Sequence, residues 1–316
     1  WALFVLHESI GDKAFKKAIK SYLNKYAFKN VNTENFFDEI KKVSDFDLVQ
    51  FQKTWLESTA FDTPTANALL SKNNAIKVHL EVDKLKKTPL KEKIDFFNKT
   101  MDSDIHHSVK EAIISQLQTE KYEDKKELLL KALHQNNVQL RQTLAETLSK
   151  IPEDFRTEYE TLLDDKSYQT QEVSLFYLWN NFPSHRKEYL DKSKNWIGFN
   201  DYNLRTLWLS LALSTPDYSS NSEELINELV SFSTTKYEAT TRQNALEKLI
   251  AFKFINDDVL TNLVNATTHH MWQFSKFGRD SIRILLKNSE MRASFNRILP
   301  NLTPDEQFQL NRLLKE

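Results

Sequence analysis

The sequence predicts an all-α protein, with a small helical lobe followed by an α-solenoid of HEAT-like or armadillo-like helix pairs. Only 3 of its 316 residues are glycine and 7 are proline, whereas average usage would give about 7% glycine. Sandwiches, barrels and phosphate-binding loops need glycine where φ is positive, and long helices do not. An apolar pattern of helical period also recurs along most of the chain.

Residues 1–62 form the predicted lobe, with four short helices. The apolar run at residues 1–6 ends a first helix near Gly11, a C-terminal cap, and Asp12 caps the second. Thr33 starts the third helix, and Asp45 or Asp47 starts the fourth. Apolar residues at helical spacing are expected to face inward: Ala14, Phe15, Ala18, Ile19, Tyr22, Leu23, Phe36, Phe37, Ile40, Val43, Leu48, Phe51, Trp55 and Leu56.

Residues 63–89 are expected to form a junction between the lobe and the repeats. Apolar and polar residues alternate from 76 to 82, as in a strand. The same stretch also has helical spacing through Ala75, Val78, Val82 and Leu85. A single strand would have no partner elsewhere in the chain, so we expect a helix.

Residues 90–316 are predicted to alternate between two classes of helix. The first class has an apolar or small anchor, followed by similar residues four and eight positions on, and successive anchors are 31, 33, 31, 37 and 36 residues apart. Such a period is typical of helical solenoids, in which stacked neighbours bury the faces that one repeat cannot. Thr303 and Pro304 start a final capping helix. The anchors are Val109, Leu140, Val173, Leu204, Thr241 and Phe277, and the second class covers 128–133, 155–163, 186–190, 225–230 and 259–264.

A basic stripe follows this period. The residue after the anchor is Lys110, Arg141, Ser174, Arg205, Arg242 or Gly278, the last followed by Arg279. One interpretation is a structural ladder, in which each cation bonds an acid or a carbonyl of a neighbouring repeat. The other is a surface that meets a peptide carboxylate or an acidic partner, which a planar guanidinium suits. Four residues are therefore candidates to face a substrate or partner: Arg141, Arg205, Arg242 and Arg279.

Composition argues against several classes of function. The net charge is −1, from 43 basic and 44 acidic residues, so a nucleic-acid partner is not expected. No apolar run approaches the ~18 residues of a membrane span. There is no cysteine, which excludes disulfides, thiolate zinc sites and cysteine nucleophiles but leaves the compartment open.

Catalytic and metal-binding motifs are missing from the sequence. A zinc peptidase helix carries H-E-x-x-H, but His7-Glu8 is the one His-Glu pair and position 11 is Gly11. No two histidines are four residues apart, and the three glycines permit neither G-x-S-x-G nor a Walker loop. We therefore expect no catalytic residue, metal site or cofactor in this chain. Trp179, Trp196, Trp208 and Trp272 lie at helical spacing among leucines and are expected to be core residues.

The block from Ile10 to Leu56 resembles the aminopeptidase N family of zinc metallopeptidases, in the order and spacing of several short motifs. The family's stretches read roughly L-x-x-x-I-G-D-x-x-F, then Y-L-x-K-Y, N-V-T-T-x-D-F and S-x-x-D-L-x-x-F-x-x-x-W-L, and they lie at the end of its catalytic domain. The residues here that carry the resemblance are Leu6-His7-Glu8-Ser9-Ile10-Gly11-Asp12-Lys13-Ala14-Phe15, Tyr22-Leu23-Asn24-Lys25-Tyr26, Asn30-Val31-Asn32-Thr33-Glu34-Asn35-Phe36-Phe37, Val43-Ser44, Asp47-Leu48 and Trp55-Leu56.

The resemblance implies that the zinc motif, its distant glutamate ligand and the oxyanion-steadying tyrosine lie upstream of Trp1 in a longer parent. That parent would be a zinc-dependent aminopeptidase that removes N-terminal residues from peptides. This chain would be its non-catalytic C-terminal helical domain, which walls the substrate chamber. The alternative is a helical-repeat scaffold that binds a protein or peptide on its concave face. The β-sandwich that many relatives insert after the lobe has no counterpart in the sequence, unless residues 75–82 are its remnant.

The resemblance also implies a partner for the lobe, the upstream catalytic domain of the same protein. Residues 1–56, including Trp1, Phe4, Val5 and the inner faces of the next three helices, would pack on the upstream catalytic domain. Without that domain an apolar patch would remain, and such patches tend to associate. We therefore expect the chain alone to self-associate through residues 1–56.

Overall fold

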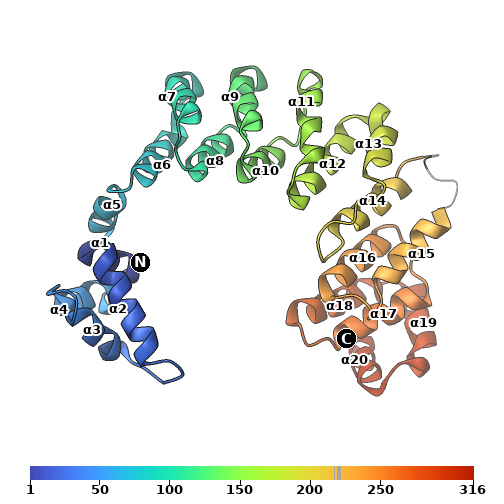
Figure 1. Ribbon diagram of the computed structural model, residues 1–316. Helices are drawn as coiled ribbons and strands as arrows, with labels where there is room; N and C mark the ends of the chain where they lie inside the picture. Colours follow the sequence, from blue (N-terminus) through green and yellow to red (C-terminus); the bar gives the residue numbers. More distant parts are fainter. Residues whose placement is uncertain (217, 219–221) are drawn as a thin grey trace. The chain divides into compact units, whose positions relative to one another are not determined.

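The computed structural model describes residues 1–216, 218 and 222–316, and within these ranges the regular structure is helical, with no strand (Figure 1). The chain divides into two compact units, residues 1–116 and residues 117–316. The prediction of an all-α fold built from serial helices is confirmed. No helix in the described ranges is both long enough and apolar enough to cross a bilayer.

The lobe in unit 1 begins with four helices, α1 (Ala2–Ile10), α2 (Asp12–Lys25), α3 (Thr33–Lys41) and α4 (Leu48–Gln52), and α4 continues into one π-helical stretch, η1 (Lys53–Glu57). Gly11 closes α1 with φ 81°, and its N–H donates to the His7 carbonyl at 2.8 Å. Gly11 is also the N-cap of α2, so the prediction that Asp12 caps this helix is wrong; Asp12 is its first residue. Asp47 rather than Asp45 caps α4, through a 2.9 Å bond from the Gln50 N–H.

The core of the lobe draws on all four helices: Val5, Leu6, Ala18, Phe37, Ile40, Leu48 and Phe51. Val5 is part of this core, so the prediction that it faces an upstream domain is wrong. The predicted stripe of α2 is only partly buried, because Ala18 is covered whereas Leu23 is 61% exposed. Leu56, also expected inside, is exposed on η1.

The rest of unit 1 runs through α5 (Thr63–Leu70), α6 (Asn74–Lys84), a 3-10 turn η2 (Leu85–Lys87), α7 (Leu90–Asp102) and α8 (His107–Gln116). Residues 75–82 are helical, as expected, and Asn73 caps α6 by accepting from the Ala75 and Ile76 N–H groups. Val78 and Val82 lie four residues apart on one face, and α6 packs against α8. Val82 is completely buried.

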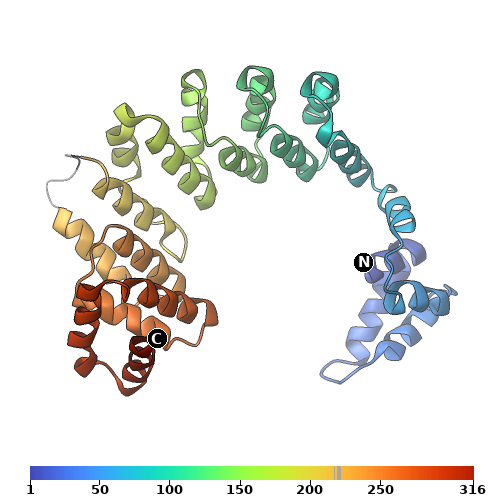
Figure 2. The ribbon, with the colours of Figure 1, turned by 180° about the vertical axis from the view of Figure 1, so that it is seen from behind.

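Unit 2 continues the alternation of helices (Figure 2). The first-class helices pack on one another in sequence, α10 on α12, α12 on α14, α14 on α16 and α16 on α18. In both views α10, α12 and α14 line the inner side of this unit, with α9, α11 and α13 outside. The helices are α9 (Tyr122–His134), α10 (Val138–Thr147), η3 (Glu153–Phe155), α11 (Arg156–Glu160), η4 (Thr161–Asp164), α12 (Tyr168–Asn181), η5 (Pro183–His185), α13 (Arg186–Ser193), α14 (Asn203–Leu213), α15 (Ser222–Phe232), α16 (Ala239–Ala251), α17 (Asp257–Thr267), α18 (Trp272–Leu285), α19 (Ser289–Ile298), η6 (Leu299–Asn301) and α20 (Pro304–Lys315).

Four of the six predicted anchors are buried as expected: Val109, Leu140, Leu204 and Thr241. The register is wrong in α12, where Val173 is half-buried and the buried positions are Thr170, Ser174, Leu175, Leu178 and Trp179. It is also wrong in α18, where Phe274, Gly278 and Ile282 are buried instead of Phe277. In both helices small or polar residues share the buried face with large apolar ones, so apolar spacing alone gave the wrong register.

Side chains of one helix close the end of the helix before it. The last carbonyls of an α-helix have no partner within the helix and need one elsewhere. In seven cases a long side chain near the start of the next helix donates to such a carbonyl at 2.8–3.3 Å. The pairs are Lys93 with Leu85, Lys125 with Leu117, Arg141 with Leu133, Gln171 with Leu163, Arg186 with Trp179, Arg205 with Lys194, and Arg242 with Ser233.

The buried hydroxyl of Thr170 gives a test of the corrected register of α12. Its side chain is fully buried, and the oxygen has no hydrogen-bond partner among the described residues. Thr170→Val keeps the shape and removes this unpaired polar atom, so we expect it to stabilise the protein by about 1 kcal/mol in urea unfolding. Thr147→Val is the control, because Thr147 donates to the Thr143 carbonyl and should gain nothing. A loss of stability in Thr170→Val would contradict this register.

Candidate functional site

Arg141 in α10 has its guanidinium fully engaged within unit 2. Its Nε donates to Asp165 at 2.6 Å, and Nη1 and Nη2 donate to the carbonyls of Leu133 and Thr161 at 2.8 and 3.1 Å. The Asp165 side chain is almost completely buried. These contacts join α9, α10 and the turn that follows η4, as the structural interpretation of the basic stripe expects.

Arg205 and Arg242 occupy the equivalent place in later repeats. Arg205 in α14 grips Glu228 of α15 with two bonds of 2.6 Å, and its guanidinium lies 4.5 Å from the Trp208 ring centroid. Arg242 in α16 is 3% exposed and donates to the Ser233 carbonyl and to Asn265. Burial lowers the pKa of Arg242, partly opposed by the charge of Glu306.

Arg279 differs from the other three candidates. It is half-buried in α18, and its Nη1 donates at 3.1 Å to Ser275 of the same helix. The residue before it, Gly278, lets α18 approach α17 closely: a Cβ there would lie 3.1 Å from that of Ala266 and from the Thr267 nitrogen. The four candidate arginines therefore differ in burial and in hydrogen-bond partners, and they do not form one uniform basic surface. Contact of any of the four with a substrate or partner stays a prediction.

Replacing Arg141 should reveal the structural part of its role. Arg141→Met leaves the buried Asp165 carboxylate and the Leu133 carbonyl without their partner, so we expect a loss of about 3 kcal/mol in urea unfolding. Arg141→Lys should recover only part, because an ammonium cannot reach all three acceptors.

The matched control is Arg283→Met, which removes an exposed pair with Glu316 and should cost below about 1 kcal/mol. Equal effects of Arg141→Met and Arg283→Met would show that Arg141 is not part of the scaffold.

Glu39 in α3 is the most perturbed carboxylate of the lobe. Its side chain is fully buried and accepts from Ser21, Lys25 and Lys42 at 2.7, 3.0 and 2.6 Å. The bonds from Lys42, Ser21 and Lys25 lower the pKa of Glu39 to about 2. Both lysine heads are half exposed, so the cluster fastens α2 to α3. Its contribution to stability is complete above pH 4.5 and is lost as the pH falls toward 2.

The histidine of the lobe does not belong to a metal site. His7 lies 3.0 Å from Glu8 through Nδ1 and 3.3 Å from Asp12 through Nε2, which leaves no free ring nitrogen. Among residues 1–216, 218 and 222–316, no three histidine, aspartate or glutamate side chains come together as metal ligands. These residues therefore do not fit the zinc that the resemblance implies for the longer parent.

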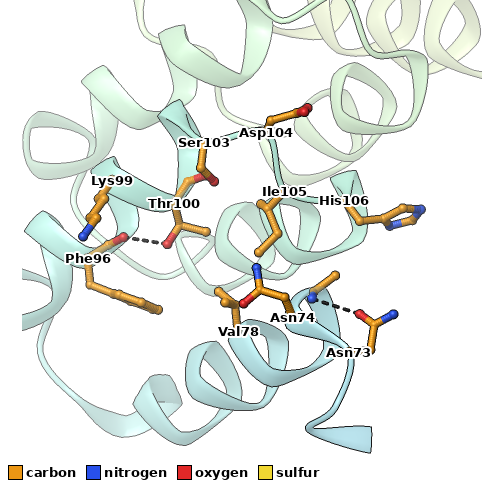
Figure 3. Close-up of a pocket in the computed structure, with 11 residues that line it drawn as sticks. Asn73, Asn74, Val78, Phe96, Lys99, Thr100, Ser103, Asp104, Ile105 and His106 are labelled. Carbon is orange, nitrogen blue, oxygen red and sulfur yellow. Dashed lines mark hydrogen bonds between the residues drawn. The ribbon is translucent and has the colours of Figure 1, made fainter. Parts of the chain in front are cut away.

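One cavity of unit 1 measures 710 Å³ and lies between the start of α6, the end of α7 and the loop before α8 (Figure 3). Asn74, Val78 and Ile105 face one another, whereas Lys99 and His106 point in opposite directions. Thr100 and Ser103 donate to the carbonyls of Phe96 and Thr100 at 2.8 and 2.7 Å. Both hydroxyls thus bond carbonyls of α7, their own or the preceding helix, and within the described residues neither forms a hydrogen bond with the Asp104 or His106 side chain.

The four tryptophans expected in the core have three different environments. Trp179 and Trp208 are core residues as expected, and their Nε1 atoms donate to Thr215 and to the Leu190 carbonyl, both at 2.8 Å. Trp196 is half-buried. Trp272 is 64% exposed, so its assignment to the core is wrong: it is the first residue of α18, where the chain enters the repeat from solvent.

Comparison with known proteins agrees with the resemblance of the lobe. Residues 2–55 match the peptidase family M1 domain. The match ends within η1 and covers the four helices that form the core of the lobe. It supports a relationship of this chain to the M1 family aminopeptidases. No solved structure matches the chain.

Proposed function

We propose that this chain is a non-catalytic helical part of a zinc metallo-aminopeptidase, in which it walls the chamber that admits peptides to the active site. The match of residues 2–55 to the M1 domain carries this proposal. The helical repeats that follow have their own hydrophobic core and would line the chamber. The polar side chains of the described residues form helix caps and ion pairs, and none of these arrangements is a catalytic site for peptide hydrolysis.

A second candidate is a helical-repeat scaffold that binds a protein or peptide partner on its concave face. The continuous layer of α10, α12, α14, α16 and α18 favours it, since such layers present extended surfaces. A scaffold of this kind has no need of an M1-like lobe, so the match at residues 2–55 favours the first proposal.

The chain alone should bind no zinc and cleave no peptide bond. We expect less than about 0.1 equivalent of zinc after dialysis against the metal, because structural and catalytic sites need three or four converging ligands. Hydrolysis of aminoacyl-anilides should not exceed that of a heat-treated sample. Stoichiometric zinc together with aminopeptidase activity would overturn the proposal.

The lobe would meet the rest of the enzyme through the uncovered face of α2. Phe15, Ile19 and Leu23 line a 320 Å³ groove there, with Lys16 and Lys20 beside them. Leu3, Val49 and Trp1 are also exposed in the lobe. An apolar face of this kind in a small lobe is typical of an interface.

Self-association of the chain provides a test of this face. We expect the apparent mass in light scattering to rise with protein concentration, and Leu23→Ser to reduce the rise by adding a hydroxyl to the groove. Ile284→Ser is the matched control, since Ile284 of α18 is similarly exposed and lies outside the lobe. A strict monomer at every concentration, or equal effects of the two variants, would contradict the assignment.

A further inference from the structure

The loop between α13 and α14 holds apolar side chains out into solvent. Phe199 is 64% exposed and Ile197 is similarly exposed, and Tyr168 at the start of α12 lies beside them, with its ring centroid 6.4 Å from that of Phe199. Together with Gly198, Asn200 and Tyr202 these residues line a groove of 540 Å³. Exposed apolar side chains gathered in one groove are typical of a binding surface.

The loop is held in one conformation by its own bonds. Gly198 has φ 94°, and a Cβ there would lie 2.2 Å from Asn203 Oδ1. The same Oδ1 accepts from the Phe199 N–H at 3.2 Å, and Asn203 Nδ2 donates to Glu172 of α12. The Arg205 N–H donates to the Ile197 carbonyl, and Thr241 of α16 bonds the Asn200 carbonyl.

Tyr202, at the end of the loop, also holds the loop in this conformation. It has φ 54°, which is unfavourable for a residue with a side chain. Its ring packs on those of Phe232 and Tyr237, with centroids 5.0 and 5.4 Å apart. A loop that keeps this conformation while exposing Ile197 and Phe199 is organised before any partner arrives, which lowers the entropy lost on binding.

The chemistry of the groove selects its occupant. All six lining residues are uncharged, which disfavours nucleic acids and strongly charged partners. Ring faces of Tyr168 and Phe199 suit apolar side chains, and the Asn200 carboxamide, without a partner in the described part of the chain, can both donate and accept. Backbone N–H groups of Gly198 and Asn200 also have no acceptor among the described residues. An extended peptide offers apolar side chains and backbone carbonyls together.

We propose that this groove, formed by Tyr168, Ile197, Gly198, Phe199, Asn200 and Tyr202, binds extended, uncharged, apolar-rich peptide segments. The rings contact alternate side chains of the peptide, and the amide groups of residues 198 and 200 bond its backbone. The proposal rests on the groove itself and does not depend on the relationship to aminopeptidases, so it survives even if that function fails.

The test uses the full chain and a fluorescein-labelled decapeptide of alternating leucine and glutamine. Anisotropy should show saturable binding below about 1 mM, and a peptide with aspartate in place of leucine should not bind. Phe199→Ser should weaken binding about fivefold to tenfold, the contribution of one aromatic contact. The matched control is Phe308→Ser: Phe308 of α20 is 66% exposed, and its replacement should leave binding unchanged.

Gly198→Ala tests the organisation of the loop without removing a ring. Because its Cβ would collide with Asn203 and with the Leu204 nitrogen, and because φ is 94°, we expect weaker peptide binding together with a lower unfolding midpoint. Four outcomes would overturn the proposal. These are no saturable binding up to that concentration, equal effects of Phe199→Ser and Phe308→Ser, tight binding of the aspartate peptide, and a change in sedimentation in place of peptide binding, which would indicate a second copy of the chain.

Discussion

The helix ends are the constraint on which the rest of this structure depends. A third to a half of helices end on a left-handed residue, mostly glycine, yet this chain has three glycines. Of these, Gly11 alone follows a helix directly, with φ 81°. Many of the other carbonyl ends are closed from outside, by a lysine, arginine or glutamine of the following helix. These helices are therefore completed by their successors, so that for them stacking serves termination as well as core burial, whereas α16 ends on its own left-handed residue, Lys253, with φ 58°.

This dependence explains why cations recur at one position of the repeat. A side chain that donates to the preceding helix must lie near the start of its own helix. It must also be next to the buried anchor, so that its aliphatic part can run along the edge of the core to the carbonyl. Arg141, Arg205 and Arg242 meet that condition. In α18 the corrected register puts the buried Ser275 in this place, and its short hydroxyl donates to the Trp272 carbonyl of the same helix. Arg279 lies one turn further on and bonds within its own helix.

Much of the fold is readable from the sequence because its signals are local. Glycine scarcity, the repeat period and caps such as Asp47 and Thr303 depend on near neighbours. What could not be read depends on distant contacts. Thr170 and Ser174 are buried beside Leu175 and Leu178 where α12 packs against α10 and α14, and apolar spacing gave no sign of this. Phe199 and Trp272 look like core residues by composition, and only their places before or at the start of a helix expose them.

The charged groups and the exposed apolar groups of this protein have different roles, the first in packing and the second at surfaces that can bind a partner. The charged groups at Glu39, Arg141 and Arg242 bond within their own units, so their free energy serves packing and is not available for a ligand. Exposed apolar groups gather instead on α2 around Leu23 and in the groove around Phe199. Charges that are already paired within the protein add little to the binding of a partner, whereas exposed apolar patches are typical binding surfaces. We therefore expect this chain to act through the surfaces that it covers in a partner or neighbouring domain. This distribution of charged and apolar groups agrees with the role that we propose for the chain, as a wall beside an active site.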